Sequence, residues 1–233
     1  MTFVNLGTPP PKDVYQPWAM SLVERVDKAL SLAWMRLQAR NPSIISTKDE
    51  DKITDELVTE LTAMRRDDQP MGFNSYFFGV PVRDGKLPNY SGRSIDQMPD
   101  LTIPLAYPRP GVSDDRHDAL FYECKVITTN RNLSLYRKKG IKRFLDGQYA
   151  WRMPHAGMIA YVFQPAPNCP VAALTSYFAR KVKKTTIGTA VGCIKGPVMA
   201  MTAPYTSVSN IAMTTHSRPF NASEINLRHL WFF

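Results

Sequence analysis

Apolar residues recur at helical spacing in the first third of the chain. In the stretch PWAMSLVERVDKALSLAWMRLQARNPS they predict one long amphipathic helix over about 17–40, which the residues NPS end. These apolar positions are Met20, Val23, Val26, Leu30, Leu32 and Met35. A second helix is predicted from STKDEDKITDELVTELTAMRR. Its acidic first turn and its arginine-rich last turn match the helix dipole.

After DDQPMG the pattern changes to β-branched and aromatic runs separated by turn residues. FNSYFFGVPV, PDLTIPLAYP and ALFYECKVI predict three strands, and the apolar run AGMIAYVF predicts a fourth strand inside a sheet. Between the last two, NLSLYRKKGIKRFLDGQYA predicts a basic helix that ends near Gly147. PVAALTSYFARKV predicts a further helix. From Thr185 onward, short strands are expected, ending with INLRHLWFF.

This order of elements predicts an α/β fold, with a mixed sheet and helices on its faces. The chain has 233 residues, of which 44% are hydrophobic, which suits one full core. We therefore expect a single domain over 1–233.

The net charge of +9 suits an anionic partner such as nucleic acid or a lipid surface, although a protein can also be basic without such a partner. Three cysteines without a CxxC pair predict neither a disulfide framework nor a zinc site, and thiols of this kind fit a reducing cytoplasm. We also expect no signal peptide and no membrane span, because the required apolar runs are missing.

Two charged residues stand out in the third predicted strand. Glu123 and Lys125 lie two residues apart among apolar neighbours, so both side chains are expected on one strand face. Triplets of the form [D/E]-x-K are common by chance, and two others begin at Glu50 and Asp84. The apolar flanks distinguish this one, because burying both charges costs several kcal/mol unless they are paired or bound to a metal. Asp100, preceded by a proline, opens the strand before it.

Pro99-Asp100 followed by Glu123-x-Lys125 on consecutive strands resembles the PD-(D/E)xK nuclease superfamily, which includes restriction endonucleases, DNA repair nucleases and phage-defence nucleases. The resemblance implies a restriction-endonuclease-like core over 49–163, with a four-stranded mixed sheet flanked by helices. Residues 1–48 would then form an N-terminal helical extension. Residues 164–233 would add a C-terminal helix and strands.

Phosphodiester hydrolysis requires neutralised phosphate charge and an activated water. The carboxylates of Asp100 and Glu123 suit Mg²⁺ or Mn²⁺, and Lys125 can orient or deprotonate the water or stabilise charge on the phosphate. At about 100° per residue, Glu50 falls on the buried stripe of the second helix, whereas Glu56 lies far round it. Glu50 is therefore the candidate third metal ligand. The alternative is a helix-start charge that reaches solvent.

Lys138, Lys139, Lys142 and Arg143 give the basic helix a strong positive charge close to the predicted site, where they can contact DNA phosphates. The alternative is a solvated basic helix face. His216 and Arg218, in the stretch THSRPF, are further candidates for phosphate contact, although a lone histidine is more often structural.

The leading hypothesis is a metal-dependent endonuclease that acts on DNA. The resemblance implies a role in bacterial anti-phage defence or restriction. The alternatives are an inactive nucleic-acid-binding or assembly subunit of the same fold, and an RNA-directed nuclease. No helix-turn-helix, zinc finger or P-loop motif is present in the sequence. A partner ATPase or recognition subunit would then supply specificity, and a homodimer is open by analogy with nucleases that cut both strands.

Overall fold

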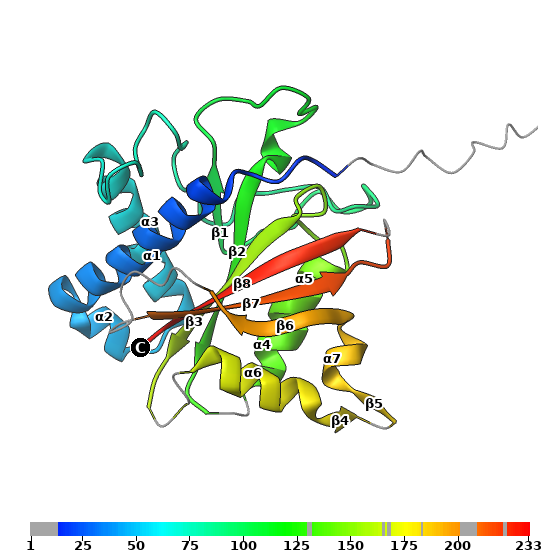
Figure 1. Cartoon of the computed structure of the whole chain (residues 1–233). Coiled ribbons are helices and arrows are strands. Elements are labelled where there is room, and N and C mark those ends of the chain that lie inside the picture. Colours follow the sequence, from blue (N-terminus) through cyan, green and yellow to red (C-terminus); the bar gives the residue numbers. More distant parts are fainter. Residues whose placement is uncertain are drawn as a thin grey trace, which may run out of the picture.

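A six-stranded mixed sheet forms the centre of this computed structural model (Figure 1). The structure describes residues 14–129, 132–164, 166, 169–182, 184–200, 209–220 and 223–233. The strands of the sheet are β1 (Leu101–Pro104), β2 (Ala119–Ile127), β3 (His155–Val162), β6 (Cys193–Met199), β7 (Ser209–Ser217) and β8 (Glu224–Phe232). Their order across the sheet is β1-β2-β3-β8-β7-β6. Strands β2, β3 and β8 run parallel, and the other neighbours are antiparallel.

The longer helices are the ones that the sequence pattern predicted. The described helices are α1 (Met20–Arg40), α2 (Pro42–Ser46), α3 (Glu50–Arg66), α4 (Leu133–Tyr136), α5 (Lys142–Leu145), α6 (Pro170–Ala179) and α7 (Ile187–Ala190). A short 3₁₀ turn covers Asp115–His117, and β4 (Lys181–Val182) pairs with β5 (Thr185–Thr186) in a small ribbon. None of the described helices is long and apolar enough to cross a membrane.

Helices cover both faces of the sheet. On one face, Trp34 of α1 stacks on Tyr161 of β3 with ring centroids 5.4 Å apart, and the Thr54 hydroxyl of α3 lies 3.0 Å from the Tyr161 hydroxyl. On the other face, the Tyr136 hydroxyl of α4 lies 2.9 Å from Nδ1 of His229 on β8. Figure 1 shows α1 and α3 on one side of the strands and α4 to α6 on the other. The expected α/β class with helices on both faces is confirmed.

One predicted strand does not form. Among the described residues, the segment 73–82 makes only isolated bridges, from Phe78 to Leu105 just after β1 and from Val82 to Thr102 of β1. The side chain of Asn74 accepts hydrogen bonds from the backbone amides of Tyr76 and Phe77, at 3.0 and 3.3 Å. These two bonds close a turn at this position. Pro81 has no amide hydrogen to donate to a neighbouring strand. The turn and the proline together break the ladder that the β-branched and aromatic composition suggested.

The C-terminal strands are longer and more central than expected. Strands β7 and β8 have nine residues each, and β8 lies beside β3 in the middle of the sheet. Residues 229–232 of the closing stretch HLWFF belong to β8, as the strand prediction had it, and Phe233 follows the strand. Residues after 164 thus complete the same sheet that carries β1 to β3. Buried apolar residues form a cluster that extends from Tyr15 to Phe232.

The basic helix between β2 and β3 contains a π-helical segment. Arg137–Ile141 forms this wider turn between α4 and α5, and Gly147, with φ of 68°, follows the end of α5. Gly140 lies so close to β3 that an added Cβ would meet the Cε atom of Met158 at 2.2 Å. The close approach brings the helix against the strand face that carries Glu123. π segments of this kind often occur at functional sites.

Candidate active site

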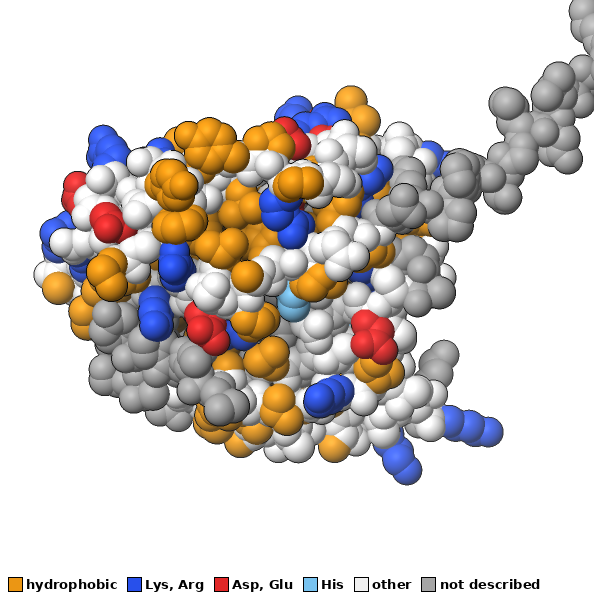
Figure 2. Space-filling view, turned by 45° about the horizontal axis from the view of Figure 1, so that its top comes forward, with side chains coloured by type: hydrophobic (Ala, Val, Ile, Leu, Met, Phe, Trp, Pro, Cys, Tyr) orange, Lys and Arg blue, Asp and Glu red, His pale blue; other side chains and the backbone are white. Residues whose placement is uncertain are grey.

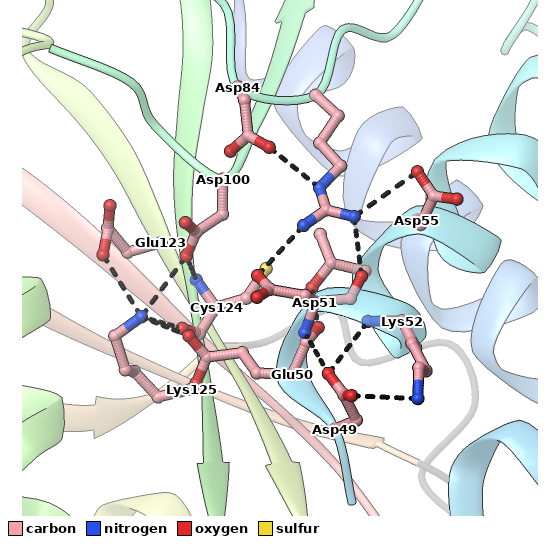
Figure 3. A network of polar contacts seen from close by, with 12 residues as sticks. Asp49, Glu50, Asp51, Lys52, Asp55, Asp84, Asp100, Glu123, Cys124 and Lys125 are labelled. Carbon is pink, nitrogen blue, oxygen red and sulfur yellow. Dashed lines mark hydrogen bonds and ion pairs between the residues drawn. The ribbon is translucent and has the colours of Figure 1, made fainter. Parts of the chain in front are cut away.

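The ammonium group of Lys125 lies among three carboxylates (Figure 3). Its Nζ atom is 2.7 Å from Oε1 of Glu50, 3.4 Å from Oδ2 of Asp100 and 3.4 Å from Oε2 of Glu123. The structure therefore brings together all four residues that the sequence proposed for catalysis. They come from three elements: the start of α3, the residue before β1, and the middle of β2.

The strand alternation on β2 sets this geometry. Glu123 and Lys125 lie on one face, and Cys124 between them faces the other, where it is fully buried and accepts a hydrogen bond from the Tyr161 hydroxyl at 3.6 Å. The predicted packing role of Cys124 is confirmed. Asp100 is held beside the pair because the amide of Cys124 donates to its Oδ2 at 2.7 Å.

Glu50 reaches the cluster from the first turn of α3. Asp49 caps this helix, since its side chain accepts from the amides of Asp51 and Lys52 at 3.1 and 3.3 Å. The Glu50 carboxylate uses both oxygens, one toward Lys125 and one to accept from the amide of Val126 at 3.1 Å. The structure places Glu50 beside the other carboxylates, and its role as a metal ligand stays a prediction.

Glu123 is fully buried and is held mainly through one oxygen. Its Oε1 accepts a hydrogen bond from Arg143 at 2.8 Å and another from the hydroxyl of Tyr149. Its Oε2 accepts no hydrogen bond from the described part of the chain and faces the Lys125 ammonium. Tyr149 was not singled out in the sequence, because no motif spacing links the end of the basic helix to β2.

Burial and charge shift the ionisation of the cluster. Burial, reinforced by the charge of Asp100, raises the pKa of Glu123 from 4.5 to about 7. Burial also raises the pKa of Glu50, although the nearby Lys125 lowers it in part. Burial alone would lower the pKa of Lys125, but Asp100, Glu123 and Glu50 together raise it above its ordinary value. Lys125 is therefore charged, whereas Glu123 is only partly ionised near neutral pH.

The donor set suits a hard divalent cation. Three carboxylates converge on Lys125, and Oε2 of Glu123 is a buried oxygen that accepts no hydrogen bond from any residue the structure describes. Among the residues that the structure describes, no group of three or more His, Cys, Asp or Glu side chains is arranged to hold a metal ion directly. The Lys125 ammonium lies between the carboxylates that would do so. By chemistry, Glu50, Asp100 and Glu123 are the side chains that fit Mg²⁺ or Mn²⁺.

The basic helix offers fewer free cations than its sequence suggested. Arg143 turns inward to Glu123, and Lys142 pairs with Asp146 at 2.6 Å on the helix surface. Lys138 and Lys139 are exposed. Arg143, one of the four residues of this helix that were predicted to contact DNA, is therefore paired with Glu123 inside the protein instead.

His216 and Arg218 lie in the interior, and their predicted phosphate contact is corrected here. The two ring nitrogens of His216 lie 2.8 Å from the Thr214 hydroxyl and 2.8 Å from the Val191 carbonyl. Arg218 is 1% exposed, and its guanidinium donates to Ser223 and to backbone carbonyls at 2.6 to 3.2 Å. His216 thus links β7 to the backbone at Val191, and Arg218 links the end of β7 to the start of β8, so neither is free to meet a phosphate.

Comparison with known proteins adds no family to this picture. No protein-family model, no curated protein and no solved structure matched the chain.

Proposed function

We propose that this chain is a metal-dependent nuclease that hydrolyses phosphodiester bonds of DNA. The observation that carries the proposal is the convergence of Glu50, Asp100 and Glu123 on the ammonium of Lys125. Carboxylates and a lysine on adjacent strands are the groups that such a reaction needs. The resemblance of these residues to the PD-(D/E)xK pattern supports the same reaction.

Each side chain has a role that follows from its place. Glu50, Asp100 and Glu123 would hold the divalent cation, which supplies charge stabilisation and a more acidic bound water. Lys125, fixed on β2 beside them, donates hydrogen bonds to a phosphate oxygen or to the attacking water. Arg143, which donates to Oε1 of Glu123 at 2.8 Å, keeps that carboxylate oriented toward the cluster.

Positive charge beside the cluster supports an anionic substrate. Lys138 and Lys139 are exposed on the helix whose Arg143 contacts Glu123, so phosphates at the site would lie close to them. The net charge of +9 acts in the same direction over a longer range.

A cleavage assay tests the proposal. Supercoiled plasmid is incubated with the full chain in Mg²⁺, Mn²⁺ or EDTA, and nicked and linear products are measured. We expect cleavage with either metal and none in EDTA, and we expect Asp100→Asn, Glu123→Gln and Lys125→Met each to abolish it. Lys52→Met, which removes an exposed lysine from a chance triplet, is the matched control and should cleave normally. Normal cleavage by all three site variants, with unchanged melting temperatures, would rule the proposal out.

The alternative is a non-catalytic nucleic-acid-binding or assembly subunit. It draws on the same geometry, because the Lys125 ammonium and the Arg143 guanidinium already pair with the three carboxylates. Salt-dependent DNA binding without cleavage in either metal would favour this alternative. Parallel assays with linear duplex, single-stranded DNA and RNA would identify an RNA-directed nuclease. A role in phage defence, a cytoplasmic location, a homodimer and a partner ATPase or recognition subunit stay predictions.

A further inference from the structure

A cavity of about 410 Å³ lies where the basic helix, the end of α7 and the end of β7 meet. Its volume is in the range of pockets that hold small organic ligands. Three of its lining side chains are cations, Arg137, Lys142 and Arg218, and one, Asp146, is a carboxylate. The lining shares no residue with the carboxylate cluster around Lys125.

Arg137 brings an unpaired guanidinium to this cavity. Its side chain is half-buried and makes no hydrogen bond or ion pair with any residue that the structure describes. Of its unpaired nitrogens, Nε alone is buried, so the two terminal nitrogens stay accessible. Lys142 differs, because its ammonium lies 2.6 Å from Oδ1 of Asp146 and the two charges compensate each other.

Arg218 adds a buried charge to the cavity wall. It is 1% exposed, and its guanidinium donates to the Ser223 hydroxyl and to backbone carbonyls, all of them uncharged acceptors. Burial lowers the pKa of Arg218 from 12.5 to about 10, and within the described part of the chain no carboxylate pairs with it. Because its donors are all used, Arg218 acts on the cavity through its charge and not through contact. A buried cation without a counter-ion favours an anion nearby.

The π turn explains why two cations of the basic helix line one cavity. In a regular α-helix, residues five apart point about 140° away from each other. Here the amide of Lys142 donates to the carbonyl of Arg137, the bond across five residues that defines a π turn. This wider turn lets both side chains line the same cavity, while Arg143, the next residue, contacts Glu123.

A hydroxyl donor is also present. Ser217 lines the cavity at an exposed position, and its hydroxyl lies 3.4 Å from the carbonyl of Gly192. This distance is longer than an ordinary bond between a hydroxyl and an oxygen, so the group is able to turn toward a ligand. The cavity thus combines an accessible guanidinium, a hydroxyl and two positive charges in excess of its single carboxylate.

The general surface charge does not mark a comparable site on the face that Figure 2 shows. Among the described side chains there, lysines and arginines are scattered among apolar and uncharged groups, with carboxylates between them. The net charge of +9 therefore acts on that face as a diffuse field. The cavity is different because its uncompensated charges are enclosed, where they are screened less.

We propose that this cavity is an anion site that binds a phosphate group. The terminal nitrogens of Arg137 form a fork that matches two phosphate oxygens, and the Ser217 hydroxyl donates to a third. A phosphate monoester carries nearly two negative charges at neutral pH, which balances the two uncompensated cations. The phosphate belongs to a nucleic-acid strand or to a free phosphate ester, since both present the same oxygens. The inference goes beyond the proposed hydrolysis and does not depend on it.

Isothermal titration calorimetry of the full chain in metal-free buffer tests the site. The probes are inorganic phosphate and thymidine 5′-monophosphate at one ionic strength, and thymidine is the phosphate-free control. We expect both phosphates to bind and thymidine not to bind. Arg137→Met should weaken the binding of both phosphates at least tenfold. Arg137→Lys keeps the charge but not the fork, so it should lose less.

A second variant adds a carboxylate without touching Arg137. Ala190 lines the cavity at an exposed position on α7, and Ala190→Glu should also weaken phosphate binding at least tenfold. Because the position is exposed, this variant stays informative if Arg137→Met fails to fold. The matched controls are Arg66→Met, at the exposed end of α3, and Ala172→Glu, at an exposed position on α6. Both controls should bind phosphate like the wild-type chain.

An oligonucleotide distinguishes the two sources of phosphate. Fluorescence anisotropy of a labelled single-stranded oligonucleotide is measured in the same buffer. If Arg137→Met weakens its binding and inorganic phosphate displaces it, the site takes a phosphate of the strand. If Arg137→Met loses the mononucleotide but binds the oligonucleotide normally, the site takes a free phosphate ester.

Three results would overturn the anion site: no binding of either phosphate by the wild-type chain, wild-type binding by both Arg137→Met and Ala190→Glu, or an equal loss in Arg66→Met. These outcomes are separate from the plasmid assay. Phosphate binding that depends on Arg137 supports the site even if no metal supports cleavage. Metal-dependent cleavage by a chain that binds neither phosphate supports the nuclease and removes the site.

Discussion

Replacing Glu123 with glutamine removes the most deeply buried carboxyl group of this site. Burial disfavours the ionised form of that group. Glu123 is 0% exposed, and burial together with the charge of Asp100 raises its pKa from 4.5 to about 7. In the unfolded chain the same carboxyl group is free to ionise at its ordinary pKa. Between these two values the folded protein holds a proton that the unfolded chain has released. Folding stability must therefore depend on pH through this residue.

The sign and size follow from the two pKa values. Because the folded state binds more protons in this window, the contribution of Glu123 is fully present below pH 4.5 and is lost as the pH rises through about 7. At 1.36 kcal/mol for each pKa unit, the interval from 4.5 to about 7 corresponds to about 3 kcal/mol. Glutamine has no carboxyl group to ionise. The free energy of unfolding of Glu123→Gln, relative to that of the wild type, should therefore rise by about 3 kcal/mol from acidic to alkaline pH.

Urea unfolding in EDTA at about pH 4.5 and about pH 8 measures this difference. The free energy of unfolding of Glu123→Gln minus that of the wild type is compared between the two pH values, so that titrating groups common to both chains cancel. Glu224→Gln, at an exposed position on β8, controls for loss of a carboxylate from the surface. If the difference for Glu123→Gln is the same at both pH values, the argument that burial raises its pKa is wrong.

Three further substitutions probe the site and the core. Tyr149→Phe removes a hydroxyl that donates to Oε1 of Glu123, so metal-dependent plasmid cleavage should fall about tenfold with the melting temperature unchanged. Gly157→Ala would place a Cβ 2.2 Å from the buried ring of Tyr122, and urea unfolding should show a loss of about 3 kcal/mol. Leu57→Ala empties a fully buried position on α3, and calorimetry should show a loss of about 3 kcal/mol.

Each of these has a result that contradicts it. Cleavage by Tyr149→Phe at the wild-type rate would show that the hydroxyl does not position the carboxylate. Wild-type stability of Gly157→Ala would mean that β3 and the neighbouring ring can separate without cost. Gly85→Ala is its matched control, because the added Cβ there meets only a valine methyl at 3.3 Å. A loss below about 1 kcal/mol in Leu57→Ala would show that α3 packs loosely.

Local pattern was sufficient where the composition and the regular geometry of an element decide its packing. Strand β2 begins and ends where the run ALFYECKVI does, because both of its faces are buried except at its charged end. Glu50 was found from helix geometry alone, since α3 is regular and capped, and 100° per residue therefore places its side chains correctly. These predictions needed no knowledge of what packs against the element.

Pattern failed where the local backbone departs from a regular strand or a regular helix. The segment 73–82 has strand composition, but the turn at Asn74 and the proline at 81 limit it to isolated bridges. Arg143 was assigned to DNA because it belongs to a strongly basic helix that was expected to start close to the site. The π turn over Arg137–Ile141 is wider than an α turn, so the residues that follow it leave the faces that a regular wheel gives them.

The charge balance of the cluster explains why these residues occur together. Glu50, Asp100 and Glu123 bring three carboxylates, whereas Lys125 and Arg143 bring two cations, so one negative charge remains when all five are ionised. Without another cation, the protein meets this excess by keeping a proton on Glu123, which is what the raised pKa expresses. A divalent cation would instead neutralise this excess negative charge, and Glu123 would then release its proton. The same geometry thus accounts for charges inside an apolar strand, and it would favour the divalent cation that the proposed reaction requires.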